Sequence, residues 1–314
     1  MPQSSAKDTD PGVLIIGSIN MDMVVRVEHM PRPGETITGQ AFDTMPGGKG
    51  ANQAVAAARL GGASTLIGRI GDDAFGKELI GHLADQGVNT QYIQATSGCP
   101  SGVAAIWVDR MGENAITVVP GANGAVSPGD LESLEPIIAA ARVVVLQLEI
   151  PIPTVCAAAR LAGRHGVWTI LDPAPAPGSA LPNELVGVDI LTPNESEAES
   201  LTGVAITGAD QAERAGRVLI GQGARCVVLT LGSRGAMIVE RDGRAVMVPA
   251  HEVDVVDSTA AGDAFTGAMA VAMAEGAGME DAVKMGCAAG SLACTRPGAQ
   301  WAMPDRAAVA AILG

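Results

Sequence analysis

The sequence predicts an α/β fold in which a doubly wound, mostly parallel sheet is flanked by helices and carries a small β-sheet lid. Short aliphatic runs alternate with Ala-rich segments of helical periodicity, as in βα units. The runs are continuous rather than interrupted by polar residues, which favours strands buried on both faces of a parallel sheet. The chain has 314 residues, 47% of them hydrophobic and 17% charged, so it can bury a large core.

The predicted strands and helices alternate from one end of the chain to the other. The clearest strand candidates are Val13–Gly17, Val143–Leu148, Val167–Leu171, Asp189–Thr192 and Val227–Leu231. The expected helices run roughly over Gly50–Leu60, Ala74–Gln86, Pro153–Arg164, Glu195–Leu201, Asp210–Gln222, Ala260–Glu275 and Met279–Cys294. We therefore expect a single α/β domain over residues 13–314.

Two segments break the alternation and predict the lid. The first is Asp22–Phe42, where a Pro31-Arg32-Pro33-Gly34 turn separates a valine-rich stretch from a second strand expected at Thr36–Thr38. The second is Ser101–Pro120, with a polar turn between two apolar runs. Both resemble β-hairpins inserted between βα units, at about 20–44 and 99–120. Together they can form a small sheet that covers an active site or contacts another subunit.

The net charge of −14 argues against nucleic acid or an anionic membrane as the main partner. It does not exclude ATP, because helix ends bind phosphate locally. The five cysteines form no C-x-x-C pair, which favours reduced thiols in a cytosolic protein. Residues 1–12 are polar, lack the apolar stretch of a signal peptide and are expected to be a disordered tail.

The stretch Asp257–Phe265 says most about chemistry, because an Ala-rich helical pattern follows it at once. A helix that begins near Ala260 directs unpaired backbone N–H groups at one point, and that point attracts phosphate. Asp263 then lies in the first turn, beside the bound anion. An anion site next to a carboxylate base is what phosphoryl transfer to a hydroxyl requires.

A purely structural interpretation of the same stretch stays open. Asp257, Ser258 or Thr259 can cap the helix, and an acid in the first turn is stabilising in any helix. Against this, the residues before Asp263 are the small Ala260, Ala261 and Gly262, which leave the approach open to a bulky ligand.

Polar residues follow most of the predicted strands, where ligands of open α/β sheets bind. They are Asn20 and Asp22, Glu149, Asp172, Asn194, and Thr230 with Gly232 and Ser233. Loops are polar in any protein, but several such residues on one edge favour a shared pocket.

Two further motifs open helices. In Gly47–Gln53, Lys49 opposes the helix dipole, which favours an anionic or polar partner, and Asn52 faces the same side as Gly48. A flexible glycine turn with a solvated lysine stays open as the alternative. In Asn194-Glu195-Ser196-Glu197, a capping box is a sufficient explanation, yet a capped helix end also directs Glu197 toward a metal–phosphate complex.

Other motifs fail. Gly71–Lys77 matches most of a Walker A loop, but Glu78 replaces the residue that holds Mg²⁺. No G-x-G-x-x-G follows the first strand, which disfavours a nicotinamide oxidoreductase. The four histidines lack zinc-ligand spacing and are interpreted as surface or structural residues.

Taken together, these segments resemble the ribokinase branch of the PfkB carbohydrate kinase family from about Val13 to Gln300. The motifs that carry the resemblance, in this order and spacing, are Gly17–Asp22, Gly47–Gln53, Thr192–Glu197, Leu229–Gly235 and Asp257–Phe265. The resemblance implies a ribokinase-like fold and transfer of a phosphoryl group from MgATP to the primary hydroxyl of D-ribose. It also implies a homodimer formed through the β-lid.

The resemblance implies roles for individual residues as well. Asp263 is similar to the family's catalytic base, with Gly262 in the anion hole. The sugar-binding set is Asn20, Asp22, Gly48, Lys49, Asn52, Glu149 and Asp263. The set around ATP and Mg²⁺ is Asn194, Glu197, Thr230, Leu231, Gly232, Ser233, Gly235, Ala261, Gly262 and Cys287. A monovalent-cation (K⁺) site is implied at Asp257, Thr259, Ala293, Arg296, Gly298 and Ala302, largely through backbone carbonyls.

Three positions depart from the ribokinase pattern. Cys287 stands where a His or Asn commonly lies near the adenine, Ala302 replaces a Ser near the cation site, and Ala264 replaces the usual Thr after the base. The alternatives are therefore another kinase of the family (for deoxyribose, fructose or a nucleoside) and a non-catalytic sugar-binding regulator. The small number of aromatic residues disfavours a nucleoside acceptor.

Overall fold

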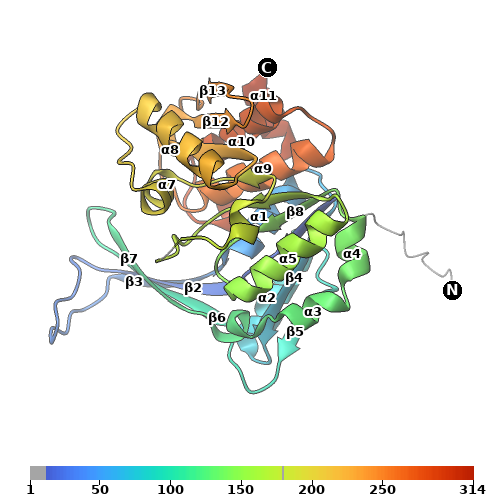
Figure 1. Cartoon of the computed structure of the whole chain (residues 1–314). Coiled ribbons are helices and arrows are strands. Elements are labelled where there is room, and N and C mark those ends of the chain that lie inside the picture. Colours follow the sequence, from blue (N-terminus) through green and yellow to red (C-terminus); the bar gives the residue numbers. More distant parts are fainter. Residues whose placement is uncertain (1–11, 179) are drawn as a thin grey trace.

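A large twisted sheet of nine strands forms the centre of the molecule (Figure 1). The computed structural model describes residues 12–178 and 180–314. Across the sheet the order is β13 (Ala245–Val248), β12 (Ala236–Glu240), β11 (Cys226–Thr230), β10 (Ile190–Leu191), β9 (Trp168–Leu171), β8 (Val143–Leu146), β1 (Val13–Ile16), β4 (Ser64–Gly71) and β5 (Ile93–Thr96). All neighbours pair in parallel except at one edge, where β12 pairs antiparallel with β11 and with β13.

The strand order reverses beside β1. The chain first adds β4 and β5 on one side of β1, then returns to its other side with β8 and continues outward to β13. The crevice between the carboxyl ends of β1 and β8 is therefore the topological switch point, where open α/β sheets bind ligands.

Helices cover both faces of this sheet, because each buried strand presents apolar side chains to both sides. In β1, Val13 and Ile15 face one apolar core, and Leu14 and Ile16 face the other. The first core is covered by α1 (Lys49–Arg59), α2 (Ala74–Asp85), α9 (Ala261–Ala274), α10 (Met279–Ala293) and α11 (Arg306–Leu313). The second is covered by α3 (Pro128–Glu132), α4 (Glu135–Ala140), α5 (Ile152–Arg164), α6 (Asn183–Val186), α7 (Glu195–Thr202) and α8 (Ala209–Gln222).

Helices α1 and α9 pack against each other at very short range. A Cβ added to Gly267 of α9 would lie 2.7 Å from the Cβ of Ala56 and 2.9 Å from the carbonyl of Gln53, both in α1. Only glycine fits there. The two helices that begin at the Gly47–Gln53 and Asp257–Phe265 motifs are therefore held as one unit.

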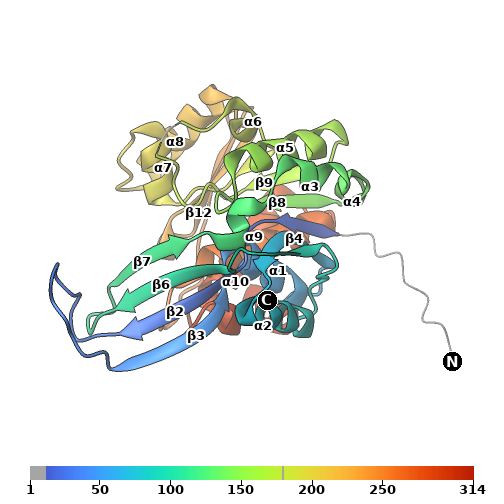
Figure 2. The same cartoon turned by 90° about the horizontal axis from the view of Figure 1, so that it is seen from below.

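A second sheet of four strands extends from the body of the molecule (Figure 2). Its order is β3 (Ala41–Gly47), β2 (Asn20–Arg26), β6 (Gly102–Val108) and β7 (Asn114–Val119). It consists of two antiparallel hairpins joined by the parallel pair β2–β6. The small separate sheet expected from the sequence is thus confirmed.

One strand of that sheet was misplaced by the sequence pattern. Thr36–Thr38 is not a strand, and β2 instead pairs with Ala41–Gly47. The register explains this, because Asn20 lies opposite Gly47, directly before α1 begins at Lys49. Because the chain enters α1 at the base of the small sheet, the second strand of this hairpin lies next to α1 and the connecting loop lies at the tip of the sheet.

The predicted α/β class and the principal strands and helices are confirmed, with boundaries within a few residues. The pattern missed β4, β5, β12 and β13 and the short helices α3, α4, α6 and α11. Short 3-10 helices cover Gly121–Ala125, Gly232–Arg234 and Gln300–Ala302. The tail expected over 1–12 lies, apart from Gly12, outside the described residues. Within the described part of the chain, no helix combines the length and apolar character needed to span a membrane.

Candidate active site

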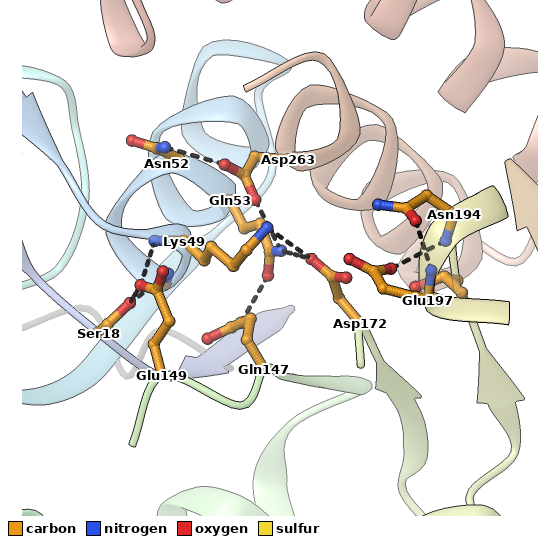
Figure 3. Close-up of polar contacts among 12 residues, drawn as sticks. Ser18, Lys49, Asn52, Gln53, Gln147, Glu149, Asp172, Asn194, Glu197 and Asp263 are labelled. Carbon is orange, nitrogen blue, oxygen red and sulfur yellow. Dashed lines mark hydrogen bonds and ion pairs between the residues drawn. The ribbon is translucent and has the colours of Figure 1, made fainter. Parts of the chain in front are cut away.

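Polar side chains from both halves of the fold meet at the switch point (Figure 3). Glu149 lies just beyond β8, Asp172 just beyond β9 and Glu197 at the start of α7, and they face the N-terminal ends of α1 and α9. The sequence predicted that polar residues following strands would gather at one edge of the sheet, and these side chains do form a cluster there.

Glu149 and Ser18 close the N-terminus of α1. The N-cap residue Gly48 has φ 89 and no capping side chain, and a Cβ there would lie 2.7 Å from the backbone nitrogen of Asn20. Glu149 Oε2 instead accepts hydrogen bonds from the Lys49 amide at 3.2 Å and the Ser18 hydroxyl at 2.5 Å. An acid from another element thus satisfies a free N–H group of the helix.

Asn20 and Asp22 belong to β2, so the base of the small sheet forms one wall of the site. Asn20 is 2% exposed; its Oδ1 accepts from Asn123 Nδ2 at 2.7 Å, and its Nδ2 donates to Glu149 at 3.5 Å. A Cβ added to Gly47 would lie 2.2 Å from Asp22 Oδ2, so the Asp22 carboxylate rests on the glycine backbone.

Asp263 is buried in the first turn of α9, at 4% exposure. Its Oδ2 accepts from Asn52 Nδ2 at 2.9 Å and its Oδ1 from Gln53 Nε2 at 3.0 Å. In the described structure Asn52 points at the carboxylate, and its own Oδ1 accepts from Gln300 at 3.0 Å. Each carboxylate oxygen keeps a lone pair for a further donor.

Helix α9 begins without a capping side chain, so the structural alternative in which Asp257, Ser258 or Thr259 caps it does not hold. The N-cap is Ala260, in the left-handed conformation with φ 59. Asp257 is engaged elsewhere: its Oδ1 accepts from the Thr259 amide and its Oδ2 from the Gly298 amide, both at 2.9 Å.

The first turn of α9 is open on one side. Gly262 is exposed, and a Cβ added there meets no atom within 4 Å. The first backbone N–H groups of a helix have no partner within the helix. The Ala261 amide donates to the Ser258 carbonyl at 3.2 Å, so the Gly262 amide, the positive helix dipole and the open approach are the features that suit an anion here, with Asp263 one residue further on.

Lys49 is the cation at the centre of a group of carboxylates. Its Nζ lies 3.8 Å from Asp172 Oδ2, with 30% of the lysine side chain exposed and 9% of that of Asp172. Burial acts to lower the pKa of Lys49, but the charges of Asp172, Asp263 and Glu149 outweigh it, so the pKa is raised. The predicted need for an anionic partner at this position is therefore met by several.

The carboxylates themselves are poised for protonation. Burial, with a smaller contribution from Glu149 and Asp263, raises the pKa of Asp22 to about 7. Burial also raises the pKa of Asp172 and of Asp263 to about 6, although Lys49 opposes it in both. Burial raises the pKa of Glu197 as well. Clusters of shifted groups in a crevice mark functional sites.

The capping box predicted at the start of α7 is present. The Asn194 side chain accepts from the Glu197 amide at 2.9 Å, and Glu197 Oε2 accepts from the Asn194 amide at 2.9 Å. Glu197 is nevertheless only 6% exposed and interacts electrostatically with Lys49 and Asp263. The cap and an orientation toward the site therefore coexist.

The residues assigned to a nucleotide form a tight turn after β11. Gly232 has φ 57 and Gly235 φ 101, and a Cβ at Gly235 would lie 2.0 Å from the carbonyl of Val248. Cys287 of α10 reaches the same carbonyl, with its Sγ 3.9 Å away. Ser233 is exposed and Thr230 is half-buried, whereas Leu231 is 2% exposed. The turn and Cys287 are thus brought together.

The two segments assigned to a monovalent cation also meet. The amides of Val256 and Asp257 donate to the carbonyl of Cys294, at 2.8 and 3.2 Å. Together with the contact from Gly298 to Asp257, these bonds fix Asp257–Thr259 beside the 293–298 loop. Ala293 and Ala302 are buried and Arg296 is exposed.

One motif rejected from the sequence has a structural explanation. Asp73 in the Walker A-like stretch caps α2, accepting from the Gly76 amide at 2.8 Å, so it shapes a helix end instead of a phosphate loop. Over residues 12–178 and 180–314, no cluster of three or more His, Cys, Asp or Glu side chains has the geometry of a metal site.

Sequence reasoning missed the amides that surround Asp263. Gln53 and Gln147 are fully buried and Gln300 is 1% exposed. Gln53 lies four residues after Lys49 in the same helical motif, and that spacing was the available signal. Asp172 was noticed only as a residue after a strand. Gln147 and Gln300 carry no local pattern, since tertiary packing alone brings them here.

Comparison with known proteins assigns the chain to a protein family. The model of the pfkB family carbohydrate kinases matches residues 10–306. The chain belongs to the PfkB family. A ribokinase of Haemophilus influenzae is 40% identical over 93% of this chain and 95% of its own length. A deoxyribokinase of Salmonella typhi is 36% identical over 93% of this chain and 95% of its own length.

Solved structures agree with this assignment. Arabidopsis thaliana ribokinase, complexed with ribose and ATP, superposes with a TM-score of 0.89 at 36% identity, covering 96% of this chain and 98% of the other. A ribokinase of Thermotoga maritima gives a TM-score of 0.87, also at 36% identity, over 96% of this chain and 98% of the other. The ribokinase-like α/β fold expected from the sequence is thus confirmed for this PfkB-family chain.

Proposed function

We propose that this PfkB-family protein is an ATP-dependent sugar kinase that phosphorylates the primary hydroxyl of D-ribose. The observation that carries the proposal is Asp263, a buried carboxylate that adjoins the open first turn of α9 at Gly262. A base and an anion site on consecutive residues suit transfer of a phosphoryl group to an alcohol. The ribokinase and ribose–ATP complex among the relatives support ATP and ribose as the substrates.

In the proposed reaction, the sugar lies between the base of the small sheet and the start of α1. Asn20, Asp22 and Glu149, with Gly48, Lys49 and Asn52, hold its other hydroxyls. Asp263 accepts the proton of the attacking hydroxyl, and the N–H group of Gly262, next to Ala261, stabilises charge on the transferred group. Because the transition state is loose, positioning contributes more than base strength.

ATP is proposed to lie along the turn of Thr230, Leu231, Gly232, Ser233 and Gly235, with Cys287 beside the adenine. Asn194 and Glu197 are proposed to organise Mg²⁺. This set fits the ion, because Mg²⁺ takes only one or two carboxylates in addition to water and phosphate oxygens. When bound, Mg²⁺ neutralises phosphate charge. The segments that carry Asp257, Thr259, Ala293, Arg296, Gly298 and Ala302 are proposed to hold K⁺ beside the anion site.

The test of this function is ADP formation with ribose, deoxyribose, fructose and adenosine as acceptors, each with K⁺ and with Na⁺. We expect ribose to give the highest kcat/KM and K⁺ to activate more than Na⁺. A preference for deoxyribose would assign the chain to the activity named for its Salmonella relative. No turnover with any sugar would favour a binding regulator.

Substitution of Gly262 by Ala is expected to lower kcat/KM by about 100-fold, the scale of a lost anion-hole contact. The new methyl group meets no protein atom, so it obstructs only a bound phosphoryl group. Stability should rise by about 0.5 kcal/mol, because a helical glycine is removed. The matched control is Gly221→Ala in α8, where a Cβ also meets nothing within 4 Å. Equal kcat/KM for the two variants would exclude Gly262 from the anion site.

Activity and stability are expected to change in opposite directions between pH 7 and pH 5. Asp263, with a pKa of about 6, must be ionised to accept a proton, so kcat/KM falls as the pH drops below about 6. Asp22 and Asp263 have folded pKa values above those of the unfolded chain, so the folded state binds more protons in this range. Their contribution to stability therefore increases as the pH falls.

A pH–rate profile and thermal unfolding at the same pH values test this expectation. Asp22→Asn should reduce the rise in stability toward acid pH, because one of the raised groups is gone. A rate that stays constant down to pH 5 would show that no group with a raised pKa must be ionised for turnover.

We further propose a homodimer formed through the small sheet. Strand β7 is an edge strand exposed along its whole length, with Ile116 55% and Val119 53% exposed, and Phe42 at the start of β3 is 57% exposed. Apolar edges of this kind pair with another chain. Light scattering at micromolar concentration should give twice the chain mass, and Ile116→Lys should halve it. A wild-type monomer would contradict this arrangement.

All five cysteines are free thiols, which supports the proposed cytoplasmic location.

A further inference from the structure

A single buried amide links the two carboxylates at the centre of the site. Gln53 Nε2 donates to Asp172 Oδ2 at 2.9 Å and to Asp263 Oδ1 at 3.0 Å. Its Oε1 accepts from Gln147 Nε2 at 2.5 Å (Figure 3). Every one of these four residues is buried, at 6% exposure or less, so water does not compete for the bonds.

The neighbour Gln147 determines which end of the Gln53 amide faces the carboxylates. A side-chain amide has a donor end and an acceptor end. Because Gln147 donates to the Gln53 oxygen, both Gln53 hydrogens must face Asp172 and Asp263. The reverse orientation would place the Gln53 oxygen against two acceptors and leave its donor end facing the Gln147 donor.

Gln147 is itself held in place by the fold. A Cβ added to Gly17 would lie 1.9 Å from Gln147 Oε1, so the amide packs directly on the backbone that follows β1. That oxygen is buried and has no hydrogen-bond partner among the described residues. Packing of this oxygen against Gly17 leaves the donor end of the Gln147 amide, Nε2, directed at Gln53.

An equivalent chain reaches the other carboxylate oxygen. Gln300 Nε2 donates to Asn52 Oδ1, and Asn52 Nδ2 donates to Asp263 Oδ2. Asp263 thus receives one donor on each oxygen, and each donor amide is oriented by a second glutamine. The carboxylate has one fixed plane and one fixed rotamer.

We propose that Gln53 is a positioning residue for phosphoryl transfer, and that Gln147 acts through it. Gln53 holds the Asp263 carboxylate in the plane from which it meets the incoming hydroxyl. Through the same amino group it ties Asp263 to Asp172, the partner of Lys49. One side chain, which need not touch the substrate, therefore fixes the position of Asp263 relative to Asp172 and its partner Lys49. This inference rests on the proposed kinase function.

The experiment compares wild type, Gln53→Met, Gln147→Met and the double variant. Methionine has nearly the volume and shape of glutamine but makes no such hydrogen bonds. We expect Gln53→Met to lower kcat by about 10- to 100-fold, the scale for sub-ångström to 1 Å misplacement, with KM for sugar and for ATP changed less than threefold. Gln147→Met should lower kcat in the same way but less. The double variant should be no slower than Gln53→Met, because both changes interrupt one chain of contacts.

A merely structural role predicts a different outcome. Thr154→Val is the control: it removes a fully buried hydrogen bond of 2.8 Å to the carbonyl of Val126, in the core on the other face of the sheet. It should lower the unfolding temperature without changing kcat. Suppose that the wild type phosphorylates sugar. Either an unchanged kcat for Gln53→Met or multiplicative losses of kcat in the double variant would then overturn the proposed role of Gln53 and leave the kinase function standing. Absence of wild-type turnover would instead overturn the kinase function and this role with it. Gln147→Met carries the test if Gln53→Met does not fold.

Discussion

Replacing Asp263 by Asn is expected to lower turnover by about two to four orders of magnitude, the range for a lost general base. Asparagine keeps the size and nearly the shape of the side chain but cannot accept the hydroxyl proton. The fold should persist, because the position is the first turn of a helix whose packing residues are unchanged. At pH 8 the variant should be at least as stable as wild type, since a buried charge with a raised pKa has been removed.

The measurement is ADP formation with saturating sugar and ATP, together with thermal unfolding. Asp130→Asn is the matched control, because Asp130 also occupies the first turn of a helix, in α3, and pairs with Arg69 at 2.6 Å. The control should lose stability and keep its turnover. Turnover of Asp263→Asn within tenfold of wild type would remove Asp263 from the mechanism and with it the central element of the proposed function.

The largest effect on stability is expected from Lys49→Met. Removal of this cation leaves Asp172, Asp263 and Glu149 without their shared countercharge. Breaking a buried pair by removing one partner costs about 3–5 kcal/mol, and the partial exposure of Lys49 places the expected loss near the lower end, at about 3 kcal/mol. Sugar phosphorylation should be lost as well.

The pH dependence distinguishes this explanation from lost packing. Below about pH 6 Asp172 and Asp263 can take up protons, so the stability difference between Lys49→Met and wild type should shrink. Urea unfolding at pH 5.5 and pH 8 measures it. Lys284→Met provides the comparison, because Lys284 forms exposed ion pairs with Glu280 and Asp281; its effect on stability should be small at both pH values. A loss for Lys49→Met that is equal at both pH values would refute the electrostatic account.

Much of the fold could be predicted because its signals are local. The aliphatic runs of β1, β8, β9 and β11 are continuous, and the helices α1, α2, α5, α8, α9 and α10 are long and periodic. Strand β4 was missed because Gly68 and Arg69 interrupt its apolar pattern. Both have tertiary causes: a Cβ at Gly68 would lie 2.8 Å from the carbonyl of Gly17, and Arg69 pairs with Asp130. The second strand of the first hairpin was misplaced because its position depends on where α1 begins.

The residues of the candidate site also divide into those with a local sequence signal and those without one. Asp263, Lys49 and Asn194 could be found because each lies in a helix-start motif with a distinct composition. Gln53 escaped notice although it lies in such a motif, since a glutamine in a helix has no special propensity. Gln147 and Gln300 acquire their roles only from partners more than 90 residues away in the sequence. Hydrogen-bond direction within a buried network is a property of the folded chain.

The close packing of α1 against α9 limits how enzymes with this architecture can diversify. Lys49 and Asn52, proposed to contact the sugar, and Asp263, the proposed base, are carried by two helices that are joined where Gly267 meets Ala56. Neither helix can be re-spaced for a longer or shorter acceptor without opening a void or a clash. New acceptors must therefore be accommodated from the opposite wall, through strands β2 and β6, while the chemical machinery stays as it is.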